Sequence, residues 1–167
     1  MKKTIITFVI ALFTGFCATS QTKFDLPQDI KLKTESDYVK YENDIVSATK
    51  WLEETDLDKE TDKRKQIDAF VINWVSGTPT ITVEMNSSIM KLYGKNNELL
   101  VLYMGSYSSY FIENKNADKT SAIKAGLVSM INVYKKGISI KKNKEMEKVI
   151  EALDQNKLDE YITKNFG

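Results

Sequence analysis

The sequence predicts an all-α fold, a compact bundle of about six or seven short helices that follows a cleaved signal peptide. Apolar residues recur at spacings of three and four along most of the chain, polar turns separate these segments, and glycines stand where several of them end. Short turns of this kind join neighbouring helices in bundles. No residue pattern repeats from one helix pair to the next, which favours a bundle over a solenoid, with stacked helical hairpins as the alternative.

The length of 167 residues fits one domain with a core of its own. We divide the chain into a signal peptide over 1–20, an extended lead-in over 21–35 and a single helical domain over 36–167. The lead-in carries Pro27 and scattered apolar residues, without helical spacing.

The N-terminus has the features of a secretory signal. Lys2 and Lys3 precede an uncharged run over 4–17, and the small residues that follow favour cleavage between Ser20 and Gln21. The run is shorter than the 20 or so residues of a membrane span. We therefore expect an exported protein, periplasmic or extracellular, with no transmembrane segment in the mature chain.

Cys17 offers a second interpretation, since a lipoprotein carries its lipid on a cysteine at the end of such a run. Phe16 stands where a lipoprotein signal has a small residue, so we favour cleavage over a lipid anchor. Cleavage after Ser20 would also remove the only cysteine of the chain.

The first two helices are predicted over 37–54 and 60–75. Thr34 and Asp37 resemble a capping box before the first of them. Gly77 and Pro79 follow the second, as expected at a helix end.

Residues 80–85, TITVEM, are ambiguous. They alternate like a strand and are rich in β-branched residues, yet Ile81 and Met85 continue to Ile89 and Leu92 at helical spacing. We predict a helix here because the neighbouring segments are helical and no second strand is visible. Gly94 closes it.

The next helix, about 98–114 with Asn97 as its cap, is apolar almost all round in its first half, which is typical of a central, buried helix. Its small residues would let another helix approach closely; they are Gly105, Ser106, Ser108 and Ser109.

Three further helices complete the domain. Asp118 begins the first, which runs to about Tyr134 and ends at Gly137; Asn143 caps the second, and the third is a short helix with Leu158, Tyr161 and Ile162.

Residue types that are missing narrow the chemistry. The chain has no histidine, which excludes Ser-His-Asp sites and His-ligated zinc or haem. Glycine-rich phosphate-binding motifs are absent as well. The acidic run Asp56, Asp58, Glu60 and Asp62 resembles the start of a calcium loop, but Thr61 and Ile67 replace its glycine and final glutamate. We predict no cofactor and no metal.

The overall charge is close to neutral, with 24 Lys and Arg against 23 Asp and Glu, and Arg64 is the only arginine. Nucleic-acid binding proteins carry a basic surface and favour arginine for phosphate and guanine contacts. We therefore predict no nucleic-acid partner.

Ser-x-x-Lys recurs along the chain, for example at Ser121 and Lys124. Penicillin-recognising enzymes use such a serine as nucleophile, but their companion motifs are missing here. We interpret these pairs as surface residues of helices.

Two carboxylates could serve an enzyme that needs neither His nor Cys. Glu84 and Glu113 stand beside apolar residues, where partial burial would raise the pKa of one carboxyl group for acid catalysis. A hydrolase acting on cell-wall or other glycans is therefore one hypothesis.

A tyrosine-rich face is the candidate for binding. Tyr103, Tyr107 and Tyr110 are spaced by four and three, so with Ser106 they could line a groove for a protein partner or a small ligand. Core packing of the rings is the simpler interpretation. Our leading hypothesis is a non-catalytic binding domain of the bacterial envelope, and a subunit of an envelope assembly is the remaining alternative.

Overall fold

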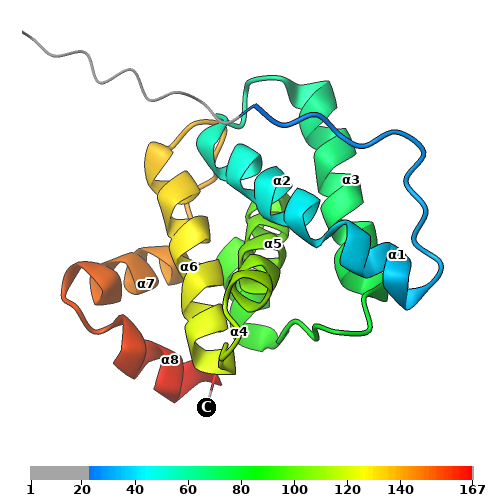
Figure 1. Cartoon of the computed structure of the whole chain (residues 1–167). Helices are drawn as coiled ribbons and strands as arrows, with labels where there is room; N and C mark the ends of the chain where they lie inside the picture. The colour runs from blue at the N-terminus through cyan, green and yellow to red at the C-terminus, as the bar shows by residue number, and fades with distance from the viewer. Residues whose placement is uncertain (1–22, 167) are drawn as a thin grey trace, which may run out of the picture.

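The computed structural model describes residues 23–166, and its regular structure is entirely helical. The eight helices of this part of the chain, shown in Figure 1, are α1 (Glu35–Lys40), α2 (Glu42–Glu54), α3 (Thr61–Gly77), α4 (Ser87–Tyr93), α5 (Asn97–Glu113), α6 (Lys119–Lys136), α7 (Lys144–Asp154) and α8 (Leu158–Phe166). The predicted all-α fold is confirmed, with one or two more helices than expected. Cys17, Ser20 and Gln21 lie outside the described residues.

Helix α5 forms the centre of the molecule, as its apolar composition predicts. It packs against α2, α3, α4 and α6, while α7 and α8 pack against α6 and each other (Figure 1). Leu99, Leu102 and Tyr103 on α5 are fully buried, together with Trp51 of α2 and Trp74 of α3. The two tryptophans and the α5 side chains belong to one continuous core.

Two glycines permit the close packing around α5. A Cβ on Gly105 would collide with Thr49 of α2, and a Cβ on Gly126 of α6 would collide with the ring of Tyr103. The small residues of α5 therefore admit a neighbouring helix, as the sequence predicts from Gly105 and the serines around it.

The predicted helix over 37–54 is interrupted. Tyr41 separates α1 from α2, and its backbone N–H donates to the carbonyl of Tyr38 in a tightened turn. The Tyr41 side chain is buried and meets the ring of Phe70 edge-on, with 6.0 Å between the ring centroids. Burial of this ring against α3 accompanies the change of direction between the two helices.

The helix predicted over 80–85 is wrong. Residues 81–86 have no regular structure, and α4 begins at Ser87 with Asn86 as its N-cap. Ile81 is buried, whereas Thr82 and Met85 are exposed. The β-branched residues of this segment thus stay outside a helix, in line with their intrinsic preference for extended backbone.

Several helix ends follow their sequence signals. Gly94 and Gly137 end α4 and α6 with positive φ angles of 55° and 68°. Asp118 and Asn143 cap α6 and α7 through their side chains. Asn97 was expected to cap α5 but is its first residue.

Asn96 precedes α5 and pairs with the backbone of Lys141, accepting from its N–H at 2.8 Å and donating to its carbonyl at 2.9 Å. Among the helices of residues 23–166, none is long and apolar enough to cross a bilayer.

Candidate functional site

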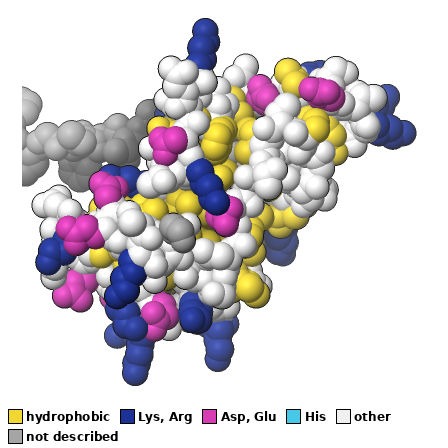
Figure 2. Space-filling model, turned by 90° about the horizontal axis from the view of Figure 1, so that it is seen from below, with side chains coloured by type: hydrophobic (Ala, Val, Ile, Leu, Met, Phe, Trp, Pro, Cys, Tyr) yellow, Lys and Arg dark blue, Asp and Glu magenta, His cyan; other side chains and the backbone are white. Residues whose placement is uncertain are grey.

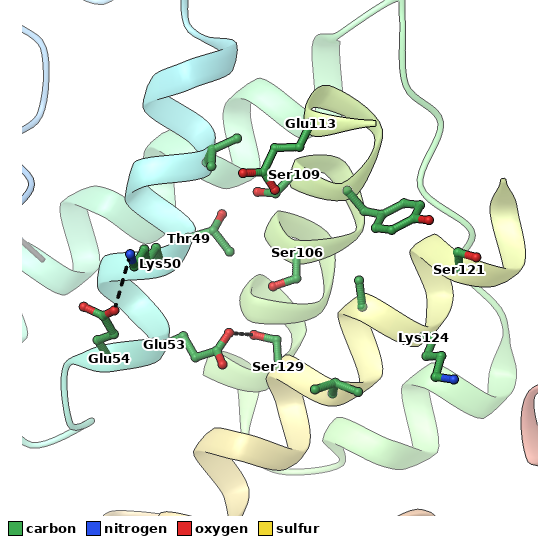
Figure 3. Close-up of a pocket in the computed structure, with 14 residues that line it drawn as sticks. Thr49, Lys50, Glu53, Glu54, Ser106, Ser109, Glu113, Ser121, Lys124 and Ser129 are labelled. Atoms are coloured by element: carbon green, nitrogen blue, oxygen red, sulfur yellow. Dashed lines mark hydrogen bonds and ion pairs between the residues drawn. The ribbon is translucent and has the colours of Figure 1, made fainter. Parts of the chain in front are cut away.

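An open cleft of about 710 Å³ lies between α2, α5 and α6 (Figure 3). Helix α5 forms its floor, and α2 and α6 form its two walls. Its volume falls in the range of small-molecule sites. The lining residues come from these three helices: Val46, Thr49, Lys50, Glu53 and Glu54 from α2; Ser106, Ser109, Tyr110 and Glu113 from α5; Ser121, Lys124, Ala125, Val128 and Ser129 from α6.

The floor is a polar stripe on the second half of α5. Ser106, Ser109, Tyr110 and Glu113 are spaced by three and four residues, so they share one helix face. The first half of α5 is buried in the core, and Gly105 in the middle of the helix lets Thr49 of α2 approach closely.

Ser109 has an unusual environment on this floor. The residue is 8 % exposed, its Oγ is buried, and that hydroxyl has no hydrogen-bond partner within the described part of the protein. A buried polar atom without a partner carries a desolvation cost that a hydrogen bond would offset. Ser109 lies beside Glu113 at one end of the cleft, four residues away on the same face (Figure 3).

Glu53 marks the opposite end of the cleft (Figure 3). Its carboxylate accepts hydrogen bonds from Ser129 Oγ and Asn132 Nδ2, both at 2.7 Å, so it bridges α2 and α6. Lys136 donates from Nζ to the backbone carbonyl of Glu53 at 2.7 Å and pairs with Asp56 at 3.4 Å. The Glu53 side chain is thereby held by neutral donors, while the nearby lysine contacts the end of α2.

Both lysines that line the cleft have acidic partners. Lys50 lies 3.9 Å from Glu54 one turn further along α2, and Lys124 forms a 2.7 Å ion pair with Asp159 of α8. Ser121 is the first member of the Ser-x-x-Lys pair that ends at Lys124. Its hydroxyl donates a 2.6 Å hydrogen bond to the carboxylate of Asp118, the N-cap of α6. The pair therefore lines the cleft, but each member is directed to a different carboxylate.

The structure separates the four residues of the predicted tyrosine groove. Ser106 and Tyr110 line the cleft, whereas Tyr103 and Tyr107 are 0 % and 2 % exposed and belong to the core. The Tyr103 hydroxyl donates to the backbone carbonyl of Glu84 at 2.9 Å, and burial raises the pKa of Tyr103 well above its usual range. The groove that does form uses the neighbouring α5 face, which carries Ser109 and Glu113.

The two predicted catalytic carboxylates are not brought together in this cleft. Glu113 lines it, but Glu84 lies in the segment before α4 and forms a 2.8 Å ion pair with Lys119. The hydrogen bond from Lys119 to Glu84 raises the pKa of the lysine above its usual value. Glu84 therefore serves as the partner of a lysine at the start of α6.

The acidic run at the start of α3 is paired with lysines. Asp58 lies 3.5 Å from Lys59, and Asp62 lies 3.1 Å from Lys65. Within residues 23–166, no group of three or more acidic, His or Cys side chains is arranged to hold a metal ion.

A second cavity, of about 610 Å³, lies between the lead-in and α3, where it is lined by Leu26, Ile30 and Leu32 among others. These side chains already pack against the core. The cleft is the better candidate because it is larger and holds the Ser109 hydroxyl, which has no hydrogen-bond partner within residues 23–166.

Glu53, Ser109 and the α6 wall line the cleft, although the sequence did not indicate them as candidate binding residues. Glu53 and Ser129 are 76 positions apart, so only the packing of α2 on α6 brings them together. The one available signal was the serine-rich half of α5. Comparison with protein-family models, curated proteins and solved structures finds no match for this chain.

Proposed function

We propose that this protein is a non-catalytic binding domain that holds a small ligand, or a short segment of a partner, in the cleft between α2, α5 and α6. The observation that supports this most directly is the buried hydroxyl of Ser109, which has no partner among the described residues and lies in the floor of a cleft of about 710 Å³. Apolar groups from Val46, Ala125 and Val128 stand among the polar side chains of this cleft, so one ligand can find both apolar contacts and hydrogen-bonding groups there.

The alternatives have less support. A carboxylate hydrolase would need two facing acids, and Glu84 does not line the cleft that Glu113 enters. A role as a subunit of an envelope assembly remains a prediction, and no feature described above favours it over ligand binding.

The proposal is tested by filling the cleft. Backbone amide NMR spectra of the protein would be recorded with a library of small polar and amphipathic fragments. We expect hits to shift the amides of the α5 floor and the α2 and α6 walls. The variant Ser106→Phe places a ring in the floor and should weaken every such hit by at least about tenfold.

Ser87→Phe is the matched control, because Ser87 is exposed on α4, outside the cleft, and its variant should bind as the parent does. Failure of the whole library to shift cleft amides would contradict the proposal, as would equal binding by both variants.

The proposed place of action is the bacterial envelope or the outside of the cell, which the N-terminal signal pattern supports. Mass spectrometry of the protein purified from its native host should give a mature N-terminus at Gln21. A diacylated Cys17 would instead show a lipid anchor.

A further inference from the structure

The cleft has a distinct charge pattern at one end, and we propose that it selects a ligand with a protonated primary amine, held by the Glu113 carboxylate and the Ser109 hydroxyl. This inference rests on the proposed binding function of the cleft and specifies the chemistry of its ligand. The amine could be the α-amine of a peptide or amino acid, or the side-chain amine of a lysine.

The balance of charge in the cleft favours a cation. Two lysines and three glutamates line it, and both lysines already have the acidic partners described above. Within the described part of the chain, neither the Glu53 nor the Glu113 carboxylate has a basic side chain as its partner. Glu53 has neutral donors for its carboxylate, whereas Glu113 is exposed and forms no hydrogen bond or ion pair through its side chain within residues 23–166.

The position of Glu113 strengthens this conclusion. It is the last residue of α5, where the helix dipole and the free carbonyl groups favour a positive charge, yet the last turn of α5 has no basic residue. Helix α2 shows the contrast, since the charged side chains of Arg64 and Lys136 donate to carbonyls at its end, whereas the side chain that donates to the last turn of α5 is the neutral amide of Asn114. A bound cation would place a positive charge at the end of α5, as the basic side chains do at the end of α2.

Ser109 is the second, independent observation. Its buried hydroxyl, one helical turn before Glu113, can accept a hydrogen bond that no described group of the protein donates. An ammonium group has three N–H donors, so it can satisfy a carboxylate and a hydroxyl together. Tyr110 lines the same cleft, and its ring can add a cation–π contact.

The apolar residues that line the cleft indicate the chemistry of the rest of the ligand. Its apolar part, from Val46, Ala125 and Val128, suits the aliphatic portion of an amine. We expect an amine on an aliphatic chain to bind better than either ammonium or an aliphatic alcohol alone.

The test is an NMR titration of the full mature chain at pH 7 with hexylamine and with hexan-1-ol, its uncharged counterpart. Hexylamine should shift the amides of residues 106–113 and bind at least about tenfold more tightly than the alcohol. Glu113→Gln should weaken hexylamine binding by about tenfold and leave hexan-1-ol unchanged. Ser109→Ala should weaken the amine by about threefold.

Glu160→Gln is the charge-matched control, since Glu160 is exposed on α8 and does not line the cleft. It should bind hexylamine as the parent does. Two further probes distinguish the sources of the amine. Leucine amide carries only an α-amine, and Nα-acetyl-lysine amide carries only a side-chain amine. Binding of either probe at residues 106–113, lost in Glu113→Gln, supports the inference and identifies the source.

Equal affinity for hexylamine and hexan-1-ol, or unchanged amine affinity in Glu113→Gln, would overturn the amine inference while the cleft remained a binding site. The absence of any amine binding would also overturn it. The proposed function would then stand or fall on the fragment library and the Ser106→Phe variant, so the two failures are distinguishable.

Discussion

At the scale of single residues, the charged side chain that is buried in the described part of the protein is that of Arg64, the only arginine of the chain. It is 4 % exposed, lies over the ring of Trp51 at 5.6 Å from the centroid, and caps the end of α2. Desolvation lowers the pKa of this guanidinium, but its Nη2 donates to backbone carbonyls that offset part of the cost of burial. Composition alone does not indicate this structural role.

Asp68, one turn after Arg64 on α3, has a pKa that burial raises from 3.8 to about 6, although Arg64 lowers it in part. Because the folded protein holds the proton more tightly than the unfolded chain, the free energy of unfolding should fall as the pH rises from about 4 to 6. Asp68→Asn should remove most of this fall. Solvent screening at this half-buried site limits the expected gain at pH 7 to about 1 kcal/mol.

Urea unfolding of the parent and of Asp68→Asn at pH 4.5 and pH 7 measures this directly. Glu160→Gln, which also removes one carboxylate, should keep the parental dependence on pH. A stability gap between Asp68→Asn and the parent that is the same at both pH values would contradict the assigned role of Asp68.

At the scale of helices and turns, apolar periodicity and caps predicted most of the elements. Asp118, Asn143, Gly94 and Gly137 mark helix ends as expected, because each signal depends on its own backbone and on neighbours within a turn. Two features were missed. The break at Tyr41 depends on a ring contact with α3, and residues 81–86 stay outside a helix although the segments on both sides are helical.

The Asn143 side chain links α7 to α4, and this exceeds its predicted role as a cap. Its Oδ1 accepts from the N–H groups of Glu145 and Met146, and its Nδ2 donates to the carbonyls of Lys91 at 2.8 Å and Leu92 at 2.7 Å. It therefore caps the start of α7 and also satisfies carbonyls at the end of α4.

Replacement of Asn143 should separate these two roles. Asn143→Ser keeps an N-cap acceptor but loses the two amide donations, so we expect a loss of about 1–2 kcal/mol in the free energy of unfolding. Asn143→Ala loses both and should cost about 1 kcal/mol more. Urea denaturation measures the difference, and equal stabilities of the two variants would show that the cap contributes nothing.

At the scale of the whole molecule, the cleft is a product of packing that single-helix patterns do not contain. Ser106 and Tyr110 were predicted to face a groove because both follow the spacing of α5, whereas Tyr103 and Tyr107 on the adjoining face are buried in the core. The walls depend on how closely α2 and α6 approach α5, which two glycines set. The lower face seen in Figure 2 carries hydrophobic side chains among scattered charges.

Ser109 and Glu113 lie at one end of the cleft, where we place the amine of the proposed ligand. A crystal structure of the protein with hexylamine tests this assignment most directly. We predict the amine nitrogen within about 3 Å of a Glu113 carboxylate oxygen and of Ser109 Oγ, with the alkyl chain along Val128 and Val46. An empty cleft at saturating amine, or a bound molecule whose alkyl end faces Glu113, would contradict it.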